Sequence, residues 1–256
     1  MITPFMSFKE AYDHLAEDLE KVKYRRNYYL PKAIKDFHMA RKFPVWKCYR
    51  YTVPQSNNTY VVYFYAENYS CIENPKEGSF LDYHMDNERY VVKWGASGYR
   101  HTNNSEFKAL RILHFYSSHF LQRYNERFLK NDSLTSTDIA CQYLSRNEIA
   151  MQIEIDKDIN KNIEKYGEGA KTGFYVRDGF CFTNTQLEGL FGKDDNREND
   201  RVDAMLIQYK TFVNESMLTE GQHNAIMKEY CERWSRSYLN FIKESKDGVL
   251  ALKLDP

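Results

Sequence analysis

The sequence predicts an α+β fold, in which N-terminal, central and C-terminal helices pack on a mainly antiparallel sheet. Three observations support this prediction. Apolar residues recur at helical spacing near both ends of the chain, and aromatic and β-branched residues alternate through much of the interval 45–116. The third observation is the stretch Ala109–Lys130, which changes from alternation to helical spacing at its middle.

Length and composition predict one domain. The chain has 256 residues, of which 42% are hydrophobic, and this is enough to bury a single large core. No repeat, low-complexity tract or linker divides the sequence, so we expect one domain over residues 1–256. Within it we expect a helical N-terminal extension at about 7–42 and a core of sheet and helices at about 45–245.

Two helices are expected before the first strand. Ser7 and Glu10 form a capping-box pattern, and apolar residues then recur every three or four positions as far as about Tyr29. Pro31 suits the first turn of a new helix, which places a second, short helix at 32–42.

The same region carries a strong local charge. Between residues 21 and 50 there are ten Lys or Arg and one acid, Asp36, although the whole chain has a net charge of zero. Such a segment is a candidate contact for nucleic-acid phosphates, and a solvated helix face is the alternative. The candidate nucleic-acid-binding residues are Arg25, Arg26, Lys32, Lys35, Arg41 and Lys42.

Alternating segments then predict an antiparallel sheet of about five strands. Two of them flank a Pro-Gln-Ser-Asn-Asn turn and form a hairpin, and a polar loop with two glycines is expected at 95–105. The expected strands are 45–53, 60–66, 80–84, 89–94 and 110–116.

The second half of the chain predicts helices, a hairpin, a strand and a last helix. Asp178-Gly179 lies between two apolar segments, which is a strong hairpin signal, and an acidic loop follows at 189–200. In the last helix, which begins after Thr219, we expect Tyr230 and Trp234 to be buried against the sheet. The other expected elements are helices at 137–144 and 147–165 and a strand at 203–213.

Cysteine usage and the N-terminal sequence predict a cytoplasmic protein with no membrane segment. The five cysteines are widely spaced and never form a C-x-x-C pair, so we expect free thiols in a reducing compartment. The first residues lack a basic segment followed by an apolar one. We expect no metal and no cofactor, because no H-E-x-x-H motif or other convincing ligand set occurs.

The chemistry is expected where the central strand runs into the central helix. His119, Arg123 and Arg127 recur every four residues on one helix face, and His114 lies on the preceding strand. Two guanidinium groups can bind a phosphate and stabilise its transition state, while an imidazole can transfer the proton of a ribose hydroxyl. These groups suffice for metal-independent RNA cleavage. The alternative is that the arginines pair with Glu126 or with later acids.

The segment Ser117–Arg127, S-x-H-F-L-Q-R-Y-N-E-R, resembles the start of small toxin-like domains grouped with the barnase, colicin and RelE-type ribonucleases. In those domains a strand leads into a helix with His-x3-Arg-x3-Arg, and a curved sheet follows. The resemblance implies that His119 is a general acid or base and that Arg123 and Arg127 bind phosphate. It also implies that Thr211, near the end of the last strand, is a further polar group of the site.

Two functions therefore remain open. The first is a toxin-like, metal-independent ribonuclease with RNA as its partner. The second is a non-catalytic interaction protein, such as an immunity, phage or mobile-element protein, that binds a protein partner. Convergence of His119, Arg123, Arg127 and Thr211 in one exposed pocket would favour the enzyme, and arginines paired within the fold would favour the interaction protein.

Overall fold

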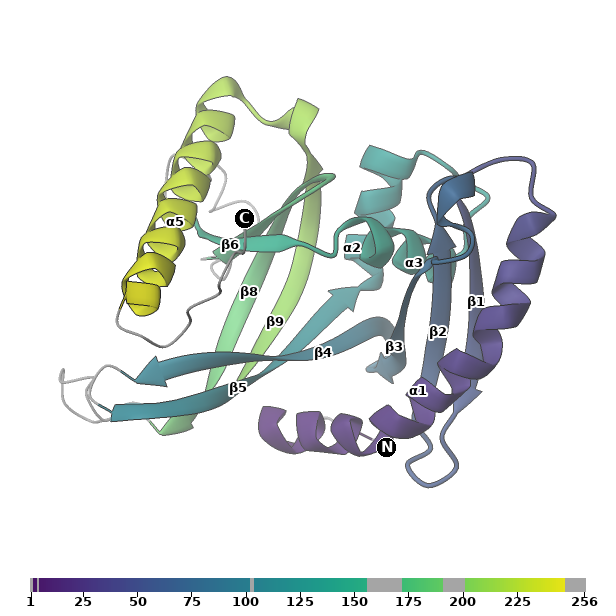
Figure 1. Ribbon diagram of the computed structural model, residues 1–256, viewed down its shortest axis with the longest axis horizontal. Helices are drawn as coiled ribbons and strands as arrows, with labels where there is room; N and C mark the ends of the chain where they lie inside the picture. Colours follow the sequence, from purple (N-terminus) through teal and green to yellow (C-terminus); the bar gives the residue numbers. More distant parts are fainter. Residues whose placement is uncertain (1, 4, 102–103, 156–171, 191–200, 247–256) are drawn as a thin grey trace.

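The computed structural model describes residues 2–3, 5–101, 104–155, 172–190 and 201–246. Its nine strands form one mainly antiparallel sheet, which together with the helices confirms the predicted α+β class (Figure 1). The strands are β1 (Val45–Thr52), β2 (Thr59–Ala66), β3 (Lys76–Met85), β4 (Glu88–His101), β5 (Asn104–Ser117), β6 (Ala150–Glu154), β7 (Thr172–Val176), β8 (Gly179–Leu190) and β9 (Arg201–Asn214).

The sheet joins two antiparallel segments through one parallel pair. The strand order is β1-β2-β3-β4-β5-β9-β8-β7-β6, and only β5 and β9 run parallel among the described strands. Their pairing extends to Tyr116 opposite Tyr209. Beyond that pair the chain after β5 turns into the helix that begins at Ser118, whereas β9 continues to Asn214, so the start of that helix lies beside the middle of β9.

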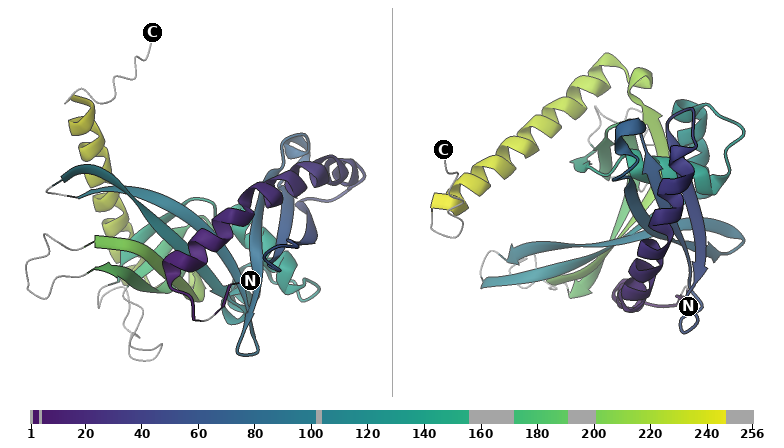
Figure 2. Two further views of the ribbon diagram at one scale, coloured as in Figure 1. Left: turned by 90° about the horizontal axis from the view of Figure 1, so that it is seen from below. Right: turned by 45° about the vertical axis from the view of Figure 1, so that its right-hand side comes forward.

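Helices cover both faces of the sheet. The two faces separate by strand alternation: in β2, Val61 and Tyr63 point to the side of α2 and α3, whereas Val62 and Phe64 point to the side of α1. Figure 2 shows α1 lying across the first strands, and α5 lies on the far side of the molecule from α1 in Figure 1. The helices are α1 (Phe8–His38), α2 (Ser118–Tyr124), α3 (Ser136–Arg146) and α5 (Glu220–Lys246).

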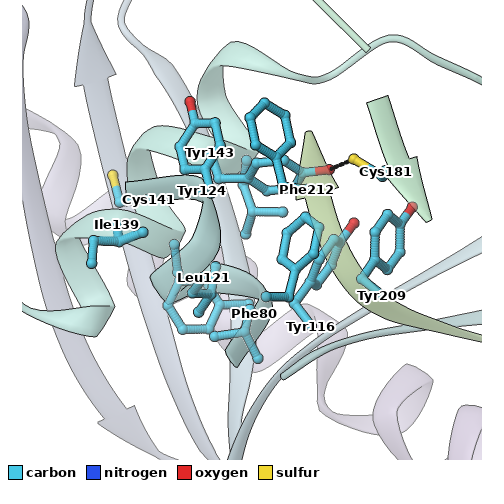
Figure 3. Close-up of a cluster of buried hydrophobic side chains, with 14 of the residues drawn as sticks. Phe80, Tyr116, Leu121, Tyr124, Ile139, Cys141, Tyr143, Cys181, Tyr209 and Phe212 are labelled. Carbon is cyan, nitrogen blue, oxygen red and sulfur yellow. Dashed lines mark hydrogen bonds between the residues drawn. The ribbon is translucent and has the colours of Figure 1, made fainter. Parts of the chain in front are cut away.

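The core under α2 and α3 is built from aromatic rings. Tyr116 and Tyr209 stack with their ring centroids 4.1 Å apart, and Tyr143 meets Tyr116 edge-on at 5.4 Å. The dashed line in Figure 3 marks the contact between the Tyr143 hydroxyl and the Cys181 thiol, which lie 3.2 Å apart. Buried hydroxyls need such partners, so the tyrosine-rich composition gives a core with polar contacts inside it.

Helix α1 is continuous, which corrects the prediction of two helices. Its N-terminus is the predicted capping box of Ser7 and Glu10, but Pro31 lies inside the helix. Proline removes a backbone N–H and disfavours a helix interior. Here Ala33 and Phe37 are buried in the same layer as Val22, so packing on the sheet outweighs that preference.

Two other predicted elements are wrong. Residues 95–101 and 104–105 of the predicted loop belong to strands, because β4 runs through Gly95 to His101 and β5 begins at Asn104, and residues 102–103 lie outside the described residues. The long β4–β5 hairpin extends toward the lower left of Figure 1. The predicted helix at 147–165 contains β6, whose Ile153 side chain is buried, and residues 156–165 lie outside the described residues.

The last helix also differs from its prediction. Ile226 is buried near Ile153 and Phe180, but Trp234 is 54% exposed and Tyr230 is only half-buried. The Asp178-Gly179 hairpin is confirmed, with Val176 paired to Gly179. Most of the predicted acidic loop, 191–200, lies outside the described residues.

Candidate active site

A pocket of about 460 Å³ lies where the pairing of β5 with β9 ends. His119 lines it from the first turn of α2, Lys210 lines it from within β9, and Glu88 and Tyr90 line it from the start of β4. Tyr90 belongs to the apolar layer under α1, so the pocket lies on that side of the sheet. His119 and Lys210 are both exposed. Neither side chain forms a hydrogen bond or an ion pair with a residue that the structure describes.

Local sequence explains why His119 faces the pocket. The Ser117 hydroxyl caps α2 by accepting a hydrogen bond from the Phe120 backbone N–H at 3.1 Å. Phe120 is fully buried, which sets the rotation of the helix and leaves His119 on its outer side. Ser118 donates to the Arg89 carbonyl at 2.8 Å, so the start of α2 is tied to β4.

Lys210 reaches the pocket through a β-bulge. In the β8–β9 ladder Phe182 pairs with Thr211 and Thr183 pairs with Tyr209, which leaves Lys210 as the extra residue. A bulge bends the strand and redirects a side chain, and bulges are frequent beside active sites. The expectations from sequence missed Lys210 and named its neighbour Thr211. Alternation along a strand cannot show where a bulge will fall.

The wall beside the pocket is held by buried charge pairs. Arg89 bonds the buried Asp82, and its Nη2 donates to the Thr137 hydroxyl at 2.9 Å. Arg50 also pairs with Asp82, at 2.9 Å. The Arg89 side chain is therefore held by contacts within the fold. Glu88 accepts a hydrogen bond from the Tyr90 hydroxyl at 2.6 Å, which raises the pKa of that hydroxyl to about 12.

Arg123 does not take part in this pocket. Its Nη1 lies 2.7 Å from Oε2 of Glu126, and both side chains are about 40% exposed. The pair lowers the pKa of Glu126. Residues three apart on a helix are neighbours, so Arg123 can pair with Glu126. This pairing is the alternative that the sequence left open for Arg123.

Arg127 and Thr211 bond each other instead of lining the pocket. The Arg127 guanidinium donates to the Phe212 carbonyl and, at 3.4 Å, to the Thr211 hydroxyl. The Asn214 side chain donates back to the Arg127 carbonyl at 3.2 Å. Arg127 lies in a π-helical turn, η2 (Asn125–Leu129), which has more residues per turn than an α-helix and so turns Arg127 out of the predicted face.

His114 lies on the other face of the sheet from the pocket. Its Nδ1 is 3.2 Å from the Tyr209 hydroxyl, inside the layer under α2 and α3. Burial, helped by the nearby charge of Lys93, lowers the pKa of His114 to about 4. The two histidines therefore do not form one site, and His119 is the one that solvent reaches.

Comparisons with protein-family models, with curated proteins and with solved structures give no significant match. The resemblance of Ser117–Arg127 to ribonuclease toxins therefore stays an expectation. Within the described ranges, no group of three or more His, Cys, Asp or Glu has the arrangement of a metal site. No helix there is both long and apolar enough to cross a membrane.

The basic residues of α1 form a separate surface. Arg26 pairs with Glu77 at the start of β3, whereas the pocket lies at the end of β3, roughly 25 Å away by strand geometry. Arg25 lies over the Tyr51 ring at 4.9 Å and Lys32 over the Tyr28 ring at 4.2 Å. The remaining candidates are all exposed: Lys35, Arg41 and Lys42.

Proposed function

We propose that the protein is a metal-independent ribonuclease whose active site is the pocket of His119 and Lys210. The observation that carries the proposal is that an exposed imidazole and a bulged, exposed ammonium group line one pocket, where the parallel pairing of β5 with β9 ends. The proposal moves the chemistry away from Arg123 and Arg127. It keeps the role of His119 that the resemblance to toxin-like ribonucleases implies.

The pocket contains the groups that RNA transesterification needs. The substrate's 2′-hydroxyl attacks the adjacent phosphorus, its proton passes to a base, and an acid protonates the leaving 5′-oxygen. His119 and the Glu88 carboxylate can share these two roles. Lys210 is placed to offset the negative charge that grows on the phosphate. The products are a 2′,3′-cyclic phosphate and a 5′-hydroxyl, so the step consumes neither water nor metal.

The outer surface of α1 gives RNA a second place to bind. Tyr24 and Tyr28 are 70% and 50% exposed, and Arg25 and Lys32 lie beside the Tyr28 ring. Exposed aromatic rings next to cations suit single-stranded RNA, because bases stack on the rings and phosphates meet the charges. All five cysteines are free thiols, which fits a cytoplasmic location for this activity.

The test is cleavage of single-stranded RNA by the purified protein in EDTA. Wild-type protein should leave a cyclic or 3′-phosphate, and DNA should survive because it lacks the attacking hydroxyl. His119→Ala should lower the rate by about a hundredfold to ten-thousandfold while the protein stays folded. His223→Ala, which changes a histidine on α5, is the control and should keep full activity.

Inactive wild-type protein on RNAs of varied sequence and structure would end the proposal, as would full activity of His119→Ala. The second candidate function, a non-catalytic interaction protein, would then be preferred. One specific observation favours it: Arg123 and Arg127 are both satisfied by contacts inside the fold.

A further inference from the structure

A second cavity, of about 210 Å³, lies on the opposite face of the sheet from the proposed active site. Its floor is formed by β4, β5 and β9, and the end of α3 closes one side. Lys93 and His114 lie opposite each other in the β4–β5 ladder, and both line this cavity. It is thus lined by two ionisable nitrogen groups, an ammonium and an imidazole, that the proposed ribonuclease does not use.

Lys93 lacks a counter-ion. Across the parts of the chain that the structure describes, no carboxylate lies within 4.0 Å of its ammonium group. The carboxylate that lines the cavity, Glu148, is paired with Lys76 at 3.0 Å. Burial accordingly lowers the pKa of Lys93. A half-buried ammonium is unfavourable unless an anion pairs with it, so the cavity favours a negatively charged ligand.

His114 supplies a second donor toward the same space. Its Nδ1 is used by the Tyr209 hydroxyl, and its pKa of about 4 keeps the ring neutral near pH 7. In the tautomer in which Tyr209 donates to Nδ1, the proton of the ring is on Nε2. No hydrogen bond of Nε2 occurs among the described residues, so in that tautomer the Nε2–H is available to an acceptor.

Aromatic rings form much of the remaining wall. Tyr116, Tyr143 and Tyr209, which Figure 3 shows together, line the cavity along with Leu144 and Asn147. The volume corresponds to about seven water molecules of liquid, which limits the ligand to a small molecule. Ring faces favour a hydrocarbon portion, whereas a fully hydrated ion such as chloride would leave these apolar walls uncovered.

We propose that this cavity binds a small organic monocarboxylate. Its carboxylate pairs with the Lys93 ammonium and accepts the His114 Nε2–H, and its hydrocarbon portion lies against Tyr116 and Tyr143. Glu148 and Ala150 are exposed beside the cavity, which gives the ligand a way in from solvent. The site is independent of His119 and Lys210, so it stands whether or not the protein cleaves RNA.

The experiment is a calorimetric titration of the full chain with sodium acetate, butyrate and benzoate, each compared with its neutral amide at constant ionic strength. At least one carboxylate should bind saturably and raise the melting temperature, and its amide should bind about tenfold to a hundredfold more weakly. Lys93→Met, which keeps an unbranched side chain one atom shorter and removes the charge, should lose the binding. Lys228→Met, on the exposed side of α5, is the matched control and should bind like wild type.

A second measurement uses the wild-type protein alone, so it does not depend on whether Lys93→Met folds. In the wild-type protein, saturation with the carboxylate should shift the NMR signals of the Lys93 side chain and of the His114 ring, and leave those of Lys228 unchanged. The proposal is overturned if none of the three carboxylates binds saturably. It is also overturned if binding survives Lys93→Met, or if the shifts occur away from Lys93 and His114.

Discussion

His114 and His119 are five residues apart but have opposite surroundings, because β5 ends between them. His114 is still part of β5, where alternation turns its side chain into the aromatic layer. His119 lies in the first turn of α2, where the burial of Phe120 turns it outward. Position relative to the strand end therefore decides which histidine is a neutral ring inside the aromatic layer and which is open to solvent.

The buried histidine makes stability depend on pH. The pKa of His114 is lowered from 6.5 to about 4 by burial, so the unfolded chain binds this proton first as pH falls. Stability from this residue is present above pH 6.5 and is lost between there and pH 4, by at most about 3 kcal/mol. Urea unfolding of wild type and His114→Phe at pH 7 and pH 4.5 measures it. An equal loss in both proteins would show that His114 is not responsible.

For helices and strands, residue spacing predicted that an element is present better than it predicted the residues at which one type of structure changes into another. The capping box of Ser7 and Glu10 forms as the sequence indicates, because a short polar side chain and an acid three residues later satisfy the same helix end. The π-helical turn at Asn125–Leu129 and the bulge at Lys210 were not predictable. Both depend on packing against strands distant in sequence, and together they decide which side chains reach the pocket.

Pro31 allows a direct test of how α1 is stabilised. Pro31→Ala would restore a backbone N–H inside the helix and remove the clash of the proline ring, so the free energy of unfolding should rise by about 1–3 kcal/mol. Lys35→Ala, an exposed position of the same helix, is the control and should change it by less than about 0.5 kcal/mol. A melting temperature that falls in Pro31→Ala would show that the proline is needed for the path of α1.

For the whole molecule, the parallel pairing of β5 and β9 is the feature that creates the candidate site. The sequence predicted the α+β class and both strands, since their alternation is clear. It did not predict that they would be neighbours, because 83 residues, from 118 to 200, separate the end of β5 from the start of β9. Pairing across that distance is set by the whole sheet. The sequence therefore pointed to His119 as a candidate, whereas it did not point to Lys210, which lines the same pocket.

The measurement that tests this account most directly is the single-turnover rate of RNA cleavage, in EDTA, for three variants of one protein preparation. We expect His119→Ala to lose about a hundredfold or more and Lys210→Ala to lose about a hundredfold, because one transfers the proton and the other stabilises the phosphate charge. Arg123→Ala should stay within about fivefold of wild type, since it breaks only an exposed pair. A severe loss in Arg123→Ala, with Lys210→Ala unaffected, would contradict the account and return the chemistry to the arginine face of the helix.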